Sequence, residues 1–309
     1  MKEYTLPIDN VIFAMLKITI VMNLKFILIA ATLFGSIEAY GQDVFGSMAP
    51  QKKATSQNAT QKISLPDKPN RTDQQGRKQG EWAKKYANGQ YIYVATFVDD
   101  KPVGKVTRYA ENGKKTSEST IANDGSAHVV YFHDNGKKAS EGKYSPNKKR
   151  NGLWTYYSEN GVRVADENYN NGKLDGLSRI YFEGGNIAEK ITYKDDVPNG
   201  SWLQYLPNGK IRLEATYVDG NLHGIYKYWD DNGSLSVVGY YRNGVSVGDW
   251  NIYEANKKSF VMQYDNNGTL LNADELQQRM NKILSEIESK RKDIVDPANY
   301  TNTPELYKP

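Results

Sequence analysis

The chain contains few residues that could perform catalysis or bind a metal. It has no cysteine and three histidines, His128, His133 and His223, none in a pattern with a carboxylate or nucleophile. Residues 230–233 and 265–268 have the Asp and Asn content of a calcium loop, but they lack its alternating ligands and distal Glu. No phosphate-binding glycine loop or nucleophile elbow is present. The sequence therefore predicts no enzyme activity, no metal and no cofactor.

Aromatic side chains are the residues whose types and spacing could serve binding instead. The chain contains 23 Tyr and 5 Trp residues, and many recur at fixed positions after regularly spaced glycines. Rings at equal positions in successive hairpins form ladders, in which a cross-strand pair contributes roughly 0.2–1 kcal/mol, so the core is the first interpretation of these columns. Some rings must still face outward, because a single-layer sheet has two faces. The candidate partner contacts are Trp154, Tyr157, Tyr181, Trp202, Tyr205, Trp229 and Trp250.

A repeat with a period of 24 residues positions these rings. Such a fixed period, within the range of about 20–50 residues, indicates a repeat array rather than one globular core. A short third unit is followed by an insertion near residues 146–150 that restores the period. The eight units open at Gly80, Gly104, Gly125, Gly152, Gly176, Gly200, Gly224 and Gly248.

Two turns divide each unit into two strands. A first turn with an Asn-Gly pair follows the opening glycine, as at Asn160-Gly161, and a second turn such as Asn171-Gly172 closes the unit. Asn-Gly between apolar runs predicts a hairpin with a type I′ turn, in which both central residues have positive φ. No helical period lies between the units. The sequence therefore predicts an all-β fold: a single-layer antiparallel β-hairpin repeat solenoid of sixteen strands, with a C-terminal amphipathic helix.

The phrase within each unit resembles the MORN repeat, most of all in its bacterial variant form. That form reads Gly-x-Trp-x-x-Tyr-Tyr-x-x-Asn-Gly, then a Glu-Gly/Ala-x-Tyr segment, then x-Asn/Asp-Gly-x-x-x-Gly. Residues 152–176 and 200–224 match it closely, and Leu222-His223-Gly224 reproduces its closing step. The resemblance covers residues 80–271.

The resemblance implies a long twisted sheet of hairpins that acts by binding and not by catalysis. Members are associated with protein scaffolding and, in eukaryotes, with phospholipid contact, and bacterial variants often carry an antitoxin-like label. Lys85 and Ile121 replace rings of the phrase in the first units. A ligand site is therefore expected after Gly152.

The N-terminal segment, residues 1–41, has the pattern of an export signal. Met22-Asn23-Leu24-Lys25 is a short basic start, an apolar core follows, and Ala39-Tyr40-Gly41 offers small residues for cleavage before Gln42. We expect translation to start at Met22 and the protein to be exported, with a retained membrane anchor as the alternative. Residues 42–79 are rich in Gln, Lys, Asn, Thr and Ser, which predicts a flexible linker.

Residues 272–309 are predicted to form a helix and a tail, because the apolar period changes after Leu271. Asp274 and Gln277 are spaced for a capping box at the start of the helix. The apolar stripe could pack against the last hairpin and cover the sheet edge, or form a coiled-coil seam that makes a homodimer. The stripe consists of Leu276, Met280, Ile283, Leu284 and Ile287.

Charge narrows the class of partner. Forty Lys and Arg residues against 36 Asp and Glu residues give a formal charge of +4, which is too mild and too evenly spread for a nucleic-acid surface. The sequence therefore predicts an exported, non-catalytic scaffold whose array, residues 80–271, binds another protein. The alternatives are a cell-wall glycan, on which aromatic rings stack, membrane phospholipid headgroups, and a toxin neutralised in an antitoxin-like role.

Overall fold

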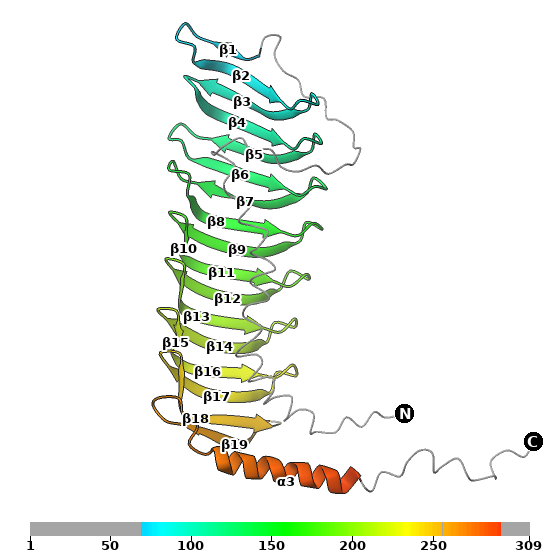
Figure 1. Ribbon diagram of the computed structural model, residues 1–309, viewed down its shortest axis with the longest axis vertical. Coiled ribbons are helices and arrows are strands. Elements are labelled where there is room, and N and C mark those ends of the chain that lie inside the picture. Colours follow the sequence, from blue (N-terminus) through cyan, green and yellow to red (C-terminus); the bar gives the residue numbers. More distant parts are fainter. Residues whose placement is uncertain (1–68, 255, 292–309) are drawn as a thin grey trace, which may run out of the picture. The chain divides into compact units, whose positions relative to one another are not determined.

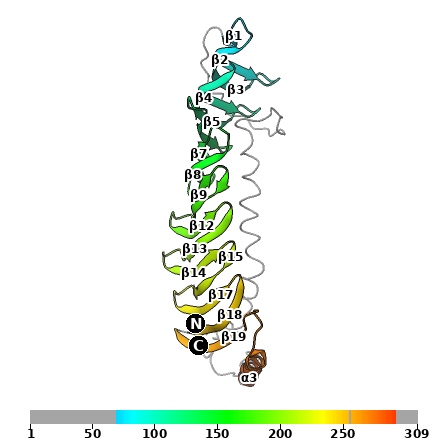
Figure 2. The same cartoon turned by 90° about the vertical axis from the view of Figure 1, so that its left-hand side faces the viewer.

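The computed structural model describes residues 69–254 and 256–291, which form nineteen β-strands in one antiparallel sheet and one helix (Figure 1). The predicted export signal and most of the predicted linker lie outside the described residues. The strands pair in chain order, and Figure 2 shows the sheet edge-on as a single layer. The predicted all-β, single-layer hairpin array is confirmed.

Sixteen of the strands are the two strands of eight units, as predicted, and three further strands have two residues each. Strand β1 already lies within the segment assigned to the linker. The elements are β1 (Arg71–Thr72), β2 (Lys78–Lys85), β3 (Tyr91–Val98), β4 (Lys101–Tyr109), β5 (Lys115–Ile121), β6 (Ala127–Phe132), β7 (Lys138–Tyr144), β8 (Arg150–Tyr157), β9 (Arg163–Asn170), β10 (Lys173–Leu174), β11 (Gly176–Tyr181), β12 (Ile187–Lys194), β13 (Val197–Tyr205), β14 (Ile211–Val218), β15 (Asn221–Leu222), β16 (Gly224–Trp229), β17 (Leu235–Arg242), β18 (Val245–Glu254), β19 (Lys257–Tyr264) and α3 (Ala273–Arg291).

The first turn of units one to seven differs from the predicted type I′ turn. In unit three the Gly136 amide donates to the His133 carbonyl at 2.8 Å, and Gly136 has a φ of 82° while Asn135 has no positive φ. This is a type I turn closed by a glycine bulge. The prediction is wrong because Asn135 is used for bonds: its Oδ1 accepts from the Lys137 amide at 3.0 Å, and its Nδ2 donates to the Glu159 carbonyl of the next unit at 2.7 Å.

The type I′ geometry occurs at the second turn. Asn171 and Gly172 have φ values of 50° and 91°, so both central residues are left-handed. The Gly172 amide then donates to the Arg150 carbonyl, on the strand that precedes this hairpin, at 2.8 Å. Along both rows of turns that flank the sheet, turn residues therefore hydrogen-bond to neighbouring hairpins. These bonds add to those between the strands.

Unit three opens at Ala127 and not at Gly125. Ala127 pairs with Tyr144 in the register in which Gly152 pairs with Tyr169. Gly125 lies in the preceding turn, where its amide donates to the Ala122 carbonyl at 2.9 Å. The prediction is wrong because a turn glycine and an opening glycine are indistinguishable by residue type.

An asparagine side chain closes each end of the sheet. At the start, Asn70 Nδ2 donates to the Ala83 carbonyl at 3.1 Å and Asn70 Oδ1 accepts from the Ala83 amide at 2.8 Å. At the other end, Asn272 Nδ2 donates to the Val261 carbonyl at 2.9 Å and Asn272 Oδ1 accepts from the Gln263 amide at 3.0 Å. Each carboxamide occupies the bonds of a missing strand, which protects the edge against addition of another chain.

The helix α3 begins directly after Asn272, and the predicted capping box does not form. Asp274 is already the second helical residue, and the Gln277 side chain donates to Asn281 at 3.0 Å. The box fails because the preceding Asn272 is committed to the sheet edge, which fixes where the helix starts. No helix among the described residues is long and apolar enough to cross a membrane.

Candidate interaction surfaces

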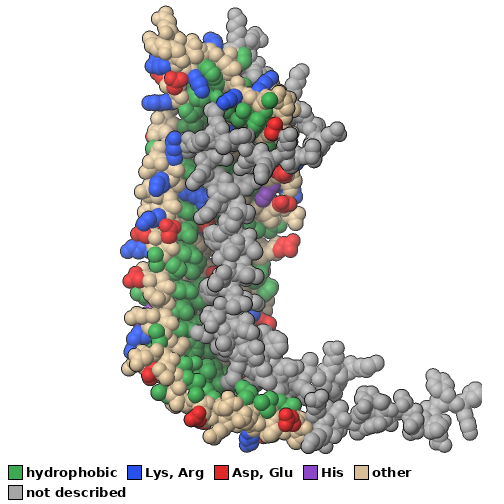
Figure 3. All heavy atoms as spheres, viewed as in Figure 1, with side chains coloured by type: hydrophobic (Ala, Val, Ile, Leu, Met, Phe, Trp, Pro, Cys, Tyr) green, Lys and Arg blue, Asp and Glu red, His purple; other side chains and the backbone are tan. Residues whose placement is uncertain are grey.

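The pairing register assigns every side chain of the array to one of two faces. In unit four Trp154 lies opposite Glu167, and Thr155 lies opposite Asp166, so successive residues alternate between the faces. We call the face that carries Trp154 the tryptophan face and the other the ladder face. Figure 3 shows hydrophobic side chains gathered in a strip that runs across the strands, along the length of the array, with charged side chains beside it.

The tryptophan face forms the core of the array. The Trp154 ring lies on Gly142 of the preceding hairpin, where any Cβ would overlap it, and its Nε1 donates to the Lys143 carbonyl at 3.1 Å. Trp250 lies on Gly239 in the same way. The exposed fractions of Trp154, Trp202 and Trp250 are 1%, 3% and 3%. Each large ring therefore locks one unit onto the unit before it.

An arginine is packed among the rings of the tryptophan face. The guanidinium carbon of Arg150 lies 4.9 Å from the Trp154 ring centre and 5.2 Å from the Tyr169 ring centre. Arg150 donates to Tyr169 Oη at 2.8 Å, and Tyr169 in turn donates to Glu167 at 2.6 Å. Burial, together with the Glu167 charge, raises the pKa of Tyr169 to about 12, so the phenol stays protonated. The guanidinium is therefore held by aromatic rings and phenol oxygens, and its role is structural.

The ladder face carries rings that alternate with cations of the preceding unit. Lys138 lies 5.9 Å from the Tyr157 ring centre, and Tyr157 donates to Glu141 at 2.7 Å. Lys138 and Glu141 form an ion pair at 2.8 Å. Burial and the Glu141 hydrogen bond raise the pKa of Tyr157 to about 12. Similar stacks join Lys115 to Phe132 at 4.2 Å and Lys190 to Tyr205 at 5.2 Å.

Asp166 is the buried charge of the ladder face, with an exposed fraction of 1%. It accepts from Thr155 Oγ1 at 3.2 Å, from Tyr181 Oη at 2.8 Å and from Arg163 Nε at 2.7 Å, with a second Arg163 bond completing a bidentate pair. The Arg163 guanidinium also lies 4.8 Å from the Tyr181 ring centre. Four donors satisfy the carboxylate, so this cluster holds units four and five together and leaves no acceptor for a ligand.

Several large apolar side chains on the ladder face are exposed, among them three near the opening glycines of units four and seven. Leu153, Ile225 and Tyr240 have exposed fractions of 48%, 56% and 39%. Ile225 and Tyr240 form a cross-strand pair, and the His223 ring lies 6.3 Å from the Tyr240 ring. Leu153 and Ile225 both follow an opening glycine. They are the side chains of this face best placed to contact another molecule.

The structure divides the seven predicted contact rings between the two faces. Trp154, Trp202 and Trp250 are buried on the tryptophan face. Alternation places the other four, which are half-buried, on the ladder face: Tyr157, Tyr181, Tyr205 and Trp229. A contact of any of them with a partner stays a prediction.

Sequence reasoning missed Leu153, Ile225 and Tyr240. A signal was available, because the residue after the opening glycine is polar in several units, as at Glu81, Ser201 and Asp249, but apolar at Leu153 and Ile225. The prediction used the recurrence of aromatic residues alone. The exposure of a side chain depends instead on which face of the sheet carries it.

Two histidines and the half-buried Glu189 have structural partners. His133 Nε2 lies 2.8 Å from the Tyr157 carbonyl, and His223 Nδ1 lies 3.1 Å from Asn243 Oδ1. Burial raises the pKa of Glu189, which accepts from Gln204 at 3.0 Å. In the described part of the chain no three His, Cys, Asp or Glu side chains are grouped to hold a metal ion. The geometry of the array suits binding across a surface.

Comparison with known proteins agrees with the hairpin geometry. The family model of the MORN repeat variant matches residues 150–171, 174–195, 198–219 and 222–243. These residues form four consecutive MORN repeat variants, and the family is a non-catalytic repeat family.

Comparison with whole proteins adds no function. No curated protein matches the chain. Among solved structures, a crystal structure of a GtfA/B complex is similar to 40% of this chain, with a TM-score of 0.21 and 16% sequence identity. The chain spans 19% of the length of that protein.

Proposed function

We propose that this chain is an exported, non-catalytic scaffold that binds another protein through the ladder face of units four to seven, residues 152–247. MORN repeats are in general protein- or membrane-binding modules. The observation that carries the proposal is the exposure of Leu153, Ile225 and Tyr240 on a face whose other side chains are mostly polar or paired. Apolar side chains set in a polar surround are typical of protein contact sites.

The architecture supports a rigid contact surface. The register repeats from unit to unit, so Leu153 and Ile225 occupy equal positions three units apart. The turns and the buried tryptophans fix those positions before any partner arrives. Little conformational entropy is then lost on binding, as in other repeat proteins that present an extended surface.

Charge indicates the chemistry of the partner. Residues 152–247 contain nine Lys and Arg residues against twelve Asp and Glu residues, a formal charge of −3. A partner protein with a basic, partly apolar surface complements these units. An anionic phospholipid surface would be repelled by them, which favours a protein over a membrane for this part of the array.

The test is an affinity pull-down from the native envelope and culture medium, with the chain from Gln42 onward as bait. We expect one stoichiometric protein, and we expect the Ile225→Ser, Tyr240→Ser double variant to lose it. The matched control is the Val98→Ser, Leu271→Ser variant, which removes two exposed apolar side chains that lie outside residues 152–247.

Each outcome bears on one part of the proposal. Retention of the protein by the control and its loss from the double variant supports the ladder face. Equal binding by both variants contradicts that surface. Recovery of polysaccharide or lipid without protein contradicts protein binding altogether and favours the glycan or phospholipid alternative, while capture of a toxic protein identifies the antitoxin-like role.

A further inference from the structure

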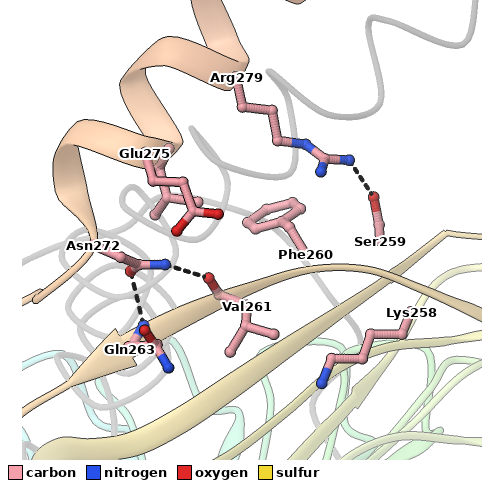
Figure 4. Close-up of a pocket in the computed structure, with 9 residues that line it drawn as sticks. Lys258, Ser259, Phe260, Val261, Gln263, Asn272, Glu275 and Arg279 are labelled. Atoms are coloured by element: carbon pink, nitrogen blue, oxygen red, sulfur yellow. Dashed lines mark hydrogen bonds between the residues drawn. The ribbon is translucent and has the colours of Figure 1, made fainter.

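The helix α3 is largely free of the sheet that it follows. Leu276 and Arg279 line an open groove of about 470 Å³ with Phe260 of β19 (Figure 4). The Arg279 guanidinium lies 5.5 Å from the Phe260 ring centre and donates to Ser259 Oγ at 3.3 Å. None of the side chains of residues 273–289 is buried. The contact with the sheet is therefore confined to the first two turns of the helix.

An apolar stripe continues along α3 beyond that contact. Leu276, Met280, Ile283 and Ile287 are spaced by four, three and four residues, which is the heptad spacing of a coiled-coil seam. Leu284 widens the stripe and is 40% exposed. Figure 1 shows α3 extending past the ends of the last strands, so its second half has no strand beneath it.

The spacing and the fold together indicate what covers this stripe. A heptad seam is completed by the knobs and holes of another helix. Within residues 69–254 and 256–291, α3 is the only helix, so the described chain cannot supply the partner itself. A second copy offers an identical stripe and closes the contact by two-fold symmetry. Pairing also explains why a helix of 19 residues, about 28 Å long, persists with so little contact to its own sheet.

We propose that α3 pairs with α3 of a second copy in an antiparallel coiled coil. Charge selects this direction. Antiparallel pairing that sets Met280 opposite Ile283 of the second copy brings Arg279 beside Glu286 of the second copy, and symmetry repeats the pair. Parallel pairing would place Arg279 beside Leu284 instead. In an antiparallel pair the starts of the two helices, where the sheets attach, lie at opposite ends of the seam.

Sedimentation velocity over a concentration series tests the association, with the chain from Gln42 onward. We expect a monomer–dimer equilibrium, which Ile283→Asp weakens by about 100-fold. The sheet should melt at the same temperature in this variant, because the groove between α3 and β19 is lined by Leu276 and Arg279, in the first two turns of the helix. The control Glu288→Arg changes a charge on the outer side of the helix, as Glu286→Arg does beside the seam, and should dimerise as the unaltered chain does. An unaltered chain that stays monomeric at every concentration overturns the proposal, since its own tail or nothing would then cover the stripe.

Charge reversal and cross-linking test the direction. Glu286→Arg and Arg279→Glu should each weaken the dimer by about tenfold, and the double variant should regain it. Because the chain has no cysteine, Ile287→Cys provides a single thiol. Antiparallel pairing separates the two thiols by about eleven residues of helix, or about 16 Å, so no disulfide should form. Rapid formation of an interchain disulfide would show a parallel seam and contradict the proposed direction.

Discussion

Val106 and Val129 stand in units two and three at the position that Trp154 holds in unit four. The backbone nevertheless pairs in the same way, with Val129 opposite Gly142 and Trp154 opposite Glu167. The family model matches units four to seven, within residues 150–243, and units two and three lie outside the match. The comparison shows that turns and register build the array, whereas the rings decide how firmly successive units are locked together.

The two regions also differ in charge. Residues 80–151 contain thirteen Lys and Arg residues against eight Asp and Glu residues, a formal charge of +5, whereas residues 152–247 carry −3. Side chains that do not determine the fold are free to vary. Here the formal charge that they contribute changes sign along one continuous sheet. A single partner with one kind of surface would therefore engage one region and not the other.

The largest effect is expected where the buried carboxylate of unit four is removed. Asp166→Ala leaves Arg163, Tyr181 and Thr155 without their acceptor and should lower the free energy of unfolding by about 3 kcal/mol. In unit two the equivalent Glu118 pairs with lysines and is 34% exposed at its side chain, so Glu118→Ala should cost about 1 kcal/mol or less. Urea denaturation followed by circular dichroism measures both. Equal losses would mean that the two regions are held in the same way.

A smaller loss is expected where a ring needs a glycine beneath it. Gly142→Ala places a methyl group inside the Trp154 ring, so we expect a loss of about 2–3 kcal/mol and a change in tryptophan fluorescence. Ser119 has the equivalent position in unit two, beside Val106, and Ser119→Ala is the control. An unchanged unfolding midpoint for Gly142→Ala would contradict the ring-locked packing.

A stabilising change is expected at the turn between units three and four. Lys148 has a φ of 63°, in a turn whose counterparts place a glycine at that position, such as Gly125 with a φ of 85°. Lys148→Gly should therefore raise the free energy of unfolding by about 1 kcal/mol. The reverse change Gly125→Lys should lower it by a similar amount. Thermal denaturation measures both variants, and their melting temperatures should shift in opposite directions. Shifts in the same direction would contradict the role of backbone strain at this turn.

The smallest effects depend on pH and have opposite signs in the two regions. The Lys138 hydrogen bond holds the pKa of Glu141 below its usual range, so its stabilisation is present at neutral pH and is lost as the pH falls through that pKa. Burial raises the pKa of Glu189. The contribution of this carboxyl group to the stability of the array is therefore present in acid and is lost as the pH rises through that pKa.

At neutral pH we therefore expect Glu141→Gln to destabilise the array and Glu189→Gln to stabilise it. Both differences should shrink on acidification, once the carboxyl groups are protonated in the folded and unfolded states alike. Unfolding midpoints measured from neutral pH down to pH values below both pKa values give the test. The same sign for both variants at neutral pH would contradict the contrast.

Much of this fold follows from the sequence, because the period of 24 residues and the turn residues act locally. The unit count, the sixteen longer strands, the single layer and the C-terminal helix were all predictable. The turn types were not, since Asn-Gly is compatible with both a type I′ turn and a glycine bulge, and tertiary bonds such as Asn135 to Glu159 select between them. The start of unit three at Ala127 likewise depends on strand pairing.

The candidate surface was less predictable. Alternation alone separates the column of Trp154 from the column of Tyr157, but burial of Trp154 depends on Gly142 in the preceding unit. Ile225 is exposed because it lies on the ladder face, opposite Tyr240. Its residue type alone does not indicate that exposure. Rings therefore identify the columns, whereas contacts between units decide which column is core and which is surface.

Hydroxyl-radical footprinting of the free chain tests the central claim most directly, because it reads the exposure of individual side chains in solution. We expect rapid oxidation of Tyr240, Leu153 and Ile225 on the ladder face. We expect slow oxidation of Trp154 and Trp202, despite the high intrinsic reactivity of indole, because both rings are buried. Oxidation of those tryptophans as fast as Tyr240 would show an open tryptophan face and would transfer the binding surface to the opposite side of the sheet.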